Sequence, residues 1–166
     1  MKLKFIAVAL FLASSTPTFA AHSIDRISGW SIYRNETTCS AYSEFTDDEF
    51  LGISYDASAR WTWIIFTDAD AKSLDEGDKR TIDVYLKRHD GSIDDSWEGI
   101  EFTLQKNSDG RRIFLSQNLG EPALSDLKNA TAIVFFYKDR KIAAYSLAGS
   151  SAALSSVERC SMDIHH

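Results

Sequence analysis

The sequence predicts a mainly β protein, an antiparallel β-sandwich or flattened barrel of about eight or nine strands with a C-terminal α-helix. Three observations predict this fold class. Short segments rich in aromatic and β-branched residues recur along the 166-residue chain. Turn sequences separate these segments. Near the C-terminus the apolar residues change to a helical spacing.

Nine segments have the composition of strands. They span residues 29–34, 38–45, 50–58, 60–68, 80–88, 99–105, 111–117, 131–139 and 141–149. In the segment 80–88, Ile82, Val84 and Leu86 alternate with outward-facing residues, which indicates a sheet with one solvated face. The segments WTWIIF and IVFFY are apolar on both faces, and we expect them to be central strands. The turns at 107–110 and 138–140 predict antiparallel hairpins.

Two helices are predicted. One covers residues 122–130, because Pro122 suits a first helical turn and Leu124 and Leu127 lie on one side. The other begins near residue 150, because its apolar residues form a single stripe: Ala153, Val157, Cys160 and Ile164. Cys160 therefore points toward whatever the last helix packs on.

The N-terminus has the pattern of a secretory signal peptide. Lys2 and Lys4 precede an apolar run over residues 5–13, and small residues follow, including Thr18 and Ala20. We expect cleavage after Ala20, which leaves a single β-rich domain over 21–166. The expected location is the periplasm or the exterior of a bacterium.

The two cysteines, Cys39 and Cys160, are expected to form one disulfide in that oxidising compartment. The bond would close a loop of about 120 residues and stabilise the fold by roughly 4 to 5 kcal/mol in the chain-entropy model. It would join the last helix to an early strand. A reactive cysteine is disfavoured, because neither residue has a neighbouring histidine or a C-x-x-C spacing.

The charge of the predicted mature chain is strongly negative. Removing residues 1–20 leaves 16 basic and 24 acidic residues, a net charge of −8 against −6 for the whole sequence. Such a field disfavours nucleic acid and anionic membranes as partners and attracts a basic protein. We expect no membrane insertion after signal cleavage. The alternative is that the charge only keeps the domain soluble.

An acidic segment over 89–99 is the predicted partner-binding loop. His89, Asp94, Asp95 and Glu98 surround Trp97 there, and we expect Trp97 to be partly exposed. Exposed aromatic residues among carboxylates suit a protein partner or a sugar ring. The alternative is a loop that folds Trp97 back over the end of the sheet. One histidine with several carboxylates does not make a zinc ligand set.

A second acidic segment, 68–78, begins like a calcium loop. Asp68, Asp70 and Asp75 are its calcium candidates, but the match ends at Lys72 and Ser73, where an EF-hand needs an oxygen ligand and then glycine. A solvated loop is the favoured interpretation. No metal and no cofactor are predicted.

The C-terminal third resembles small exported bacterial proteins of the invasion-associated locus B type. The matching residues are Leu124, Leu127, Lys128, Ser146, Leu147, Gly149, Ala152, Ala153 and Leu154. Where that family has a Gly-Cys pair before the short helix, this chain has Asn118-Leu119-Gly120. The resemblance implies a periplasmic β-sandwich with a terminal helix, and it carries over no catalytic residue.

The favoured function is a non-catalytic binding module for a protein partner. One concrete form is an acidic inhibitor or immunity-type protein directed against a basic envelope hydrolase. No nucleophile elbow, H-E-x-x-H motif or dinucleotide fingerprint occurs, so no catalytic residue is assigned. Two alternatives remain open. One is an envelope hydrolase that acts on sugars or peptides through paired carboxylates, and the other is a structural envelope protein without a discrete ligand.

Overall fold

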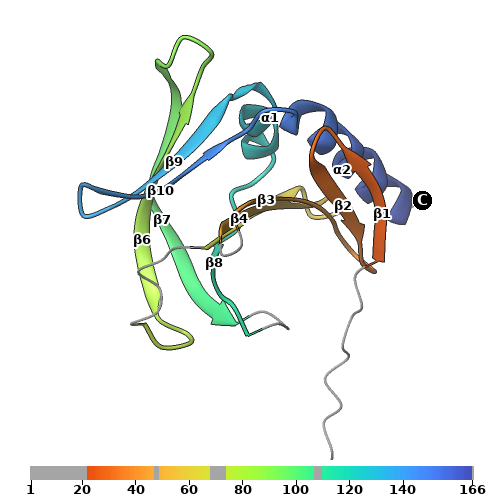
Figure 1. Ribbon diagram of the computed structural model, residues 1–166. Helices are drawn as coiled ribbons and strands as arrows, with labels where there is room; N and C mark the ends of the chain where they lie inside the picture. The colour runs from red at the N-terminus through yellow and green to blue at the C-terminus, as the bar shows by residue number, and fades with distance from the viewer. Residues whose placement is uncertain (1–21, 47–48, 68–73, 107–109, 166) are drawn as a thin grey trace, which may run out of the picture.

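Ten antiparallel strands form one open sheet in the computed structural model, which describes residues 22–46, 49–67, 74–106 and 110–165. Neighbours in the sheet follow the order β1-β2-β3-β4-β5-β8-β7-β6-β9-β10. Figure 1 shows this sheet curving from β1 round to β10. The elements are β1 His22–Ile27, β2 Trp30–Arg34, β3 Cys39–Thr46, β4 Glu49–Asp56, β5 Trp61–Phe66, β6 Lys79–Lys87, β7 Ile93–Lys106, β8 Arg112–Ser116, α1 Pro122–Asn129, β9 Ala132–Tyr137, β10 Arg140–Ser146 and α2 Ser150–Ile164.

The predicted antiparallel β fold with a disulfide-linked terminal helix is confirmed. In place of the sandwich or flattened barrel of eight or nine strands, the chain forms a single sheet of ten. The additional strand is β1, which the sequence HSIDRI did not suggest because charged residues interrupt its alternation. Both predicted hairpins are present, as β7–β8 and β9–β10.

Two strand predictions need correction. β7 begins at Ile93, so most of the acidic segment predicted as a loop is strand. Its backbone pairs with β6 in spite of the polar side chains, and two register shifts accommodate the extra residues. β5 is central, as expected, but β9 lies second from the edge of the sheet. A central position in the sheet therefore does not explain why the outer face of β9 is apolar.

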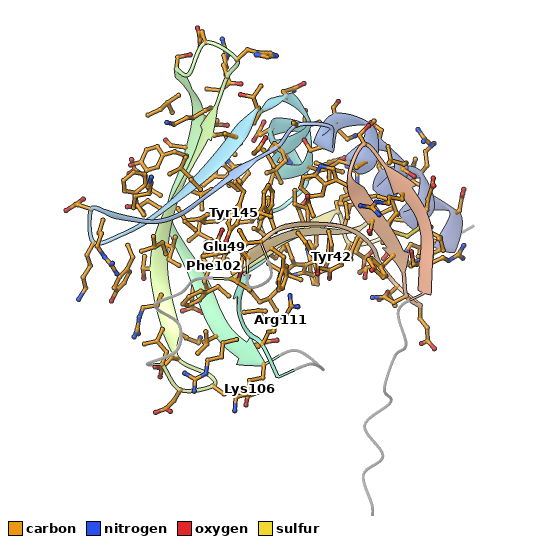
Figure 2. The ribbon with its side chains drawn as sticks, in the orientation of Figure 1. Tyr42, Glu49, Phe102, Lys106, Arg111 and Tyr145 are labelled. Carbon is orange, nitrogen blue, oxygen red and sulfur yellow. A yellow bond between two sulfur atoms is a disulfide. The ribbon has the colours of Figure 1, made fainter. Side chains whose placement is uncertain are left out.

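Aromatic rings from the central strands and from β9 pack together in one core. Phe66, from β5, is fully buried, and its ring centroid lies 4.0 Å from that of Phe135 on β9. Phe114 and Phe102 lie 5.3 and 5.4 Å from the same ring. Burial of rings at these separations is a large stabilising contribution. Figure 2 shows Phe102 and Tyr145 directed into this interior.

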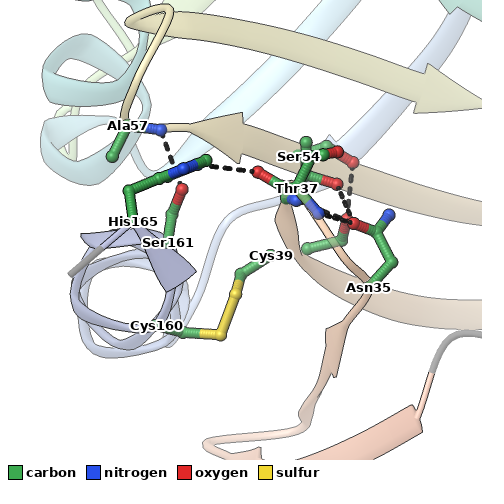
Figure 3. The surroundings of a disulfide bond; sticks show 10 residues. Asn35, Thr37, Cys39, Ser54, Ala57, Cys160, Ser161 and His165 are labelled. Atoms are coloured by element: carbon green, nitrogen blue, oxygen red, sulfur yellow. Dashed lines mark hydrogen bonds between the residues drawn. A yellow bond between two sulfur atoms is a disulfide. The ribbon is translucent and has the colours of Figure 1, made fainter. Parts of the chain in front are cut away.

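α2 covers the inner face of β2, β3 and β4. The predicted disulfide between Cys39 and Cys160 fixes it there, with 6.0 Å between the two Cα atoms and 121 residues of sequence separation. Several hydrogen bonds lie around the disulfide, as Figure 3 shows. The Ala57 amide donates to Ser161 Oγ at 2.8 Å, and the ring nitrogen Nε2 of His165 lies 3.3 Å from the Thr37 carbonyl oxygen.

The segment before α2 is held against the turn between β1 and β2. The Trp30 indole N–H donates to the Ala148 carbonyl at 3.1 Å. Gly149 has a φ of 78°, and a Cβ there would lie 2.7 Å from the Ser28 carbonyl oxygen. Glycine is therefore required at this close approach.

The curvature brings β10 back toward β3 and β5. The Tyr145 hydroxyl donates to the Thr67 carbonyl at 2.5 Å, and the Tyr145 ring centroid lies 5.0 Å from that of Phe45. Both contacts are made by the Tyr145 side chain, with Thr67 just after β5 and with Phe45 of β3. They do not pair β10 with another strand, so β10 remains the last strand of the open sheet. We call this contact region the seam.

Candidate functional site

A groove of about 600 Å³ lies on the outer face of β6, β9 and β10, and we call it the outer groove. Its floor is apolar and aromatic. In the sheet register Tyr85 pairs with Val134, and Val134 pairs with Ala144, so these three residues form one row across the strands. Phe136 lies in the next row, and its ring meets that of Tyr85 edge to face at 5.3 Å.

Strand alternation positions these side chains. Ile82, Val84 and Leu86 of β6 are buried in the core. The residues between them must therefore face outward, because successive side chains of a strand point to opposite faces. Tyr85 and Lys87 consequently line the outer groove.

The turn between β6 and β7 forms one rim. Ile93 lies on this rim with 59% of its surface exposed. Asp90 shapes the turn by accepting hydrogen bonds from the Ser92 hydroxyl at 2.6 Å and the Ser92 amide at 2.9 Å. These two bonds hold the pKa of the Asp90 carboxyl below its ordinary value. Figure 1 shows the β6–β7 and β9–β10 hairpins projecting from the body.

Charged residues of both signs flank the floor. Asp83 and Lys141 lie on either side of Phe136 in one row of the register, and Asp139 follows in the β9–β10 turn. The Gly99 amide donates to Asp83 Oδ1 at 2.7 Å. Within the described part of the chain, Lys87 and Lys141 form no ion pair.

The predicted partner-binding residues lie on β7 and the turn before it, and the strand separates them. Asp95 pairs with Leu86 and Trp97 pairs with Val84, so both face the inner side. Trp97 is half-buried and packs against the core. Trp97 and Asp95 both lie near Asp126 of α1 and influence the pKa of its carboxyl.

Burial raises the pKa of the Asp126 carboxyl, and the neighbouring Asp95 raises it further. This pair connects the β6–β7 hairpin to α1. Neither residue lines the outer groove.

The other three predicted partner-binding residues, Asp94, His89 and Glu98, lie apart from Asp95 and Trp97. Asp94 is ion-paired with Arg88 across the hairpin. His89 and Glu98 are exposed. The five predicted residues are therefore divided between two faces of the hairpin, and their role in binding stays a prediction.

The calcium candidates fall partly outside the described residues. Asp68 and Asp70 lie there, whereas Asp75 is exposed and its amide donates to Asp78 Oδ2 at 3.2 Å. Among the residues that the structure describes, no three histidine, cysteine or acidic side chains gather as metal ligands.

Comparison with known proteins identifies no relative: no family model, curated protein or solved structure matches the chain. The resemblance of the C-terminal third to the invasion-associated locus B type therefore stays a prediction. In the described part of the chain, no helix has the length and apolar character needed to cross a membrane.

Sequence reasoning missed the residues of the outer groove. Tyr85 and Phe136 lie in segments predicted only as strands, and Ile93 lies in the predicted partner-binding segment 89–99 but was not among its candidate residues. One signal was present, because IVFFY is apolar on both faces and only one face of an edge-proximal strand can enter the core. The outward, half-buried Phe136 is therefore available for another contact.

Proposed function

We propose that this chain is an exported, non-catalytic binding module, periplasmic or secreted, that contacts a protein partner through the outer groove. The disulfide supports export, because such bonds persist in oxidising compartments. The module needs no metal or cofactor for this role.

The single observation that carries the proposal is the composition of the outer groove. Aromatic and aliphatic side chains form its floor, and charged side chains form its rim. Protein–protein interfaces have this arrangement, with a central apolar pocket that excludes water and a polar surround. The exposed Ile93 adds an apolar contact at the rim.

Backbone pairing with a partner strand is less favourable than this side-chain contact. β10 begins with Arg140 and Lys141, and its register shifts between Lys141 and Ala143. β1 has a register shift too, between Ser23 and Asp25. Charges and bulges on edge strands oppose the addition of a further strand. We therefore expect recognition on the face of the sheet.

The charge of the chain favours a basic partner. The sequence carries 24 acidic and 18 basic residues. A negative field speeds encounter with a positive protein, and salt weakens this effect. An inhibitor or immunity-type protein directed against a basic envelope hydrolase is the concrete form that we favour.

Affinity capture from an envelope extract tests the proposal when two matched variants are compared. Phe136→Ser removes an aromatic ring from the groove floor. Trp61→Ser removes an exposed ring from β5, outside the groove. We expect a stoichiometric partner that binds the wild type and Trp61→Ser, and binding at least ten-fold weaker with Phe136→Ser.

The association rate of the purified partner is the second measurement. We expect it to fall markedly between low and physiological salt. A partner that binds Phe136→Ser as well as it binds Trp61→Ser would overturn the groove assignment. An association rate independent of salt would overturn the basic partner.

The hydrolase alternative has one observation in its favour, the adjacent carboxyls of Asp95 and Asp126 with a raised pKa for Asp126. Hydrolysis of peptidoglycan sugars or peptides by the wild type, lost in Asp126→Asn, would favour that alternative. Hydrolysis retained in Asp126→Asn, or absent from the wild type, would count against it.

A further inference from the structure

The outer groove differs in charge between its two ends. At one end Lys87 lies below the rim formed by Gly91 and Ile93, and no carboxylate lines the groove there. At the other end Asp83, Asp139 and Lys141 line it, two carboxylates against one ammonium. The groove is therefore cationic at the Lys87 end and net negative at the Asp83 end.

The length of the groove follows from the strand geometry. Asp83 and Lys87 lie four residues apart on β6, which corresponds to about 13 Å at roughly 3.3 Å per residue. Tyr85 lies midway between them, beside Val134. An apolar centre therefore separates two ends of opposite charge.

We propose that the outer groove binds an extended segment of about five residues from the partner protein, through the side chains of its first, third and fifth residues. An acidic residue of the segment lies at Lys87, an apolar or aromatic side chain packs on Tyr85, and a basic residue lies at Asp83 and Asp139. This inference rests on the proposed function, since it specifies what the partner presents to the same site.

The groove chemistry favours a peptide over a simple ion. The first and fifth residues of an extended segment lie about 13 Å apart, the separation of the two charged ends, and their side chains share a face with that of the third residue. A small anion would satisfy Lys87 and leave the aromatic floor exposed. The groove lies on the outer face of the sheet, so the backbone of such a segment keeps its polar groups in water while its side chains enter.

Peptide titration monitored by amide chemical shifts of the ¹⁵N-labelled, oxidised chain tests the inference. The probe peptides are Ac-Glu-Ser-Phe-Ser-Lys-NH₂ and Ac-Lys-Ser-Phe-Ser-Glu-NH₂, because a segment can run in either direction along β6. The control peptide is Ac-Lys-Ser-Phe-Ser-Lys-NH₂. We expect shifts confined to β6, β9, β10 and the β6–β7 turn, and about five-fold weaker binding of the control.

A charge reversal sharpens the test. Lys87→Glu should reverse the preference, so that the control peptide binds more tightly than either mixed-charge peptide. Lys106→Glu makes the same change on an exposed residue at the end of β7 and should leave the preference unchanged. Wild-type dispersion of the amide spectrum shows that each variant is folded.

Three results would overturn the inference: shifts outside the groove, no binding of any peptide, or an unchanged preference in Lys87→Glu. If the peptides fail while Phe136→Ser still loses the captured partner, the peptide inference is wrong and the proposed function stands. If Phe136→Ser keeps the partner, both are wrong.

Discussion

The two halves of the sheet are stabilised in different ways. In the half formed by β1 to β5, α2 and the disulfide cover the inner face of β2, β3 and β4. β6 to β10 join this half through the aromatic core and the seam at Tyr145. The outer groove lies in the second half, away from the cross-link. The disulfide and the proposed binding face therefore lie in different halves of the sheet, so the groove can present apolar side chains without weakening the helix-covered half.

The largest expected effect comes from the disulfide. Replacing both Cys39 and Cys160 by alanine should lower the free energy of unfolding by about 4 kcal/mol, because the unfolded chain gains the freedom of a 121-residue loop. Urea denaturation of the variant and the oxidised wild type measures this difference. A loss below about 1 kcal/mol would mean that packing of α2 alone holds the first half.

Phe66→Ala should cost nearly as much, about 3–5 kcal/mol, since it empties the ring position that contacts Phe102, Phe114 and Phe135. Trp61→Ala, on the same strand, is the matched control because that side chain is 46% exposed. Equal losses in the two variants, again by urea denaturation, would show that Phe66 does not join the halves.

The seam should contribute less. Tyr145→Phe keeps the ring and removes the buried hydroxyl that donates to Thr67, and we expect a loss of about 1–2 kcal/mol. The rate of amide hydrogen exchange should then rise in β10 more than in β2 and β3. A uniform rise over both halves would contradict a local role for the seam.

The smallest effect concerns pH. Because burial and Asp95 raise the pKa of Asp126, this carboxyl binds protons more tightly in the folded state, and its contribution to stability falls as pH rises from the ordinary carboxyl pKa through the raised one. Asp126→Asn should therefore be slightly more stable than the wild type at neutral pH, by less than about 0.5 kcal/mol after discounting for solvent screening. The gain should disappear in acid.

Urea denaturation at neutral and acid pH measures the effect of Asp126→Asn. Asp163→Asn, an exposed substitution on α2, is the control and should change little at either pH. A gain for Asp126→Asn that persists in acid would contradict proton binding as its cause.

The sequence predicted the parts of the fold that have local signals. Strand composition, turn residues and the helical stripe through Cys160 each act over a few residues, and the disulfide followed from there being only two cysteines. Whether the strands form two facing sheets or one curved sheet depends on long-range pairing, such as β5 with β8 and β6 with β9. No local pattern specifies those partners.

The candidate site was harder to predict for the same reason. Tyr85, Phe136 and Lys141 come from three strands and meet only through the register of β6, β9 and β10. Trp97 drew attention because its neighbours are acidic, yet pairing with Val84 turns it toward the core. The apolar outer face of β9 was the one local signal, and it was interpreted as a central strand.

Hydrogen exchange of the oxidised chain with and without the captured partner tests the central claim most directly. We predict added protection at residues 83–93 and 132–144, with little change over β2 to β5. Protection concentrated over residues 30–66, with the groove unchanged, would contradict the assignment of binding to the second half.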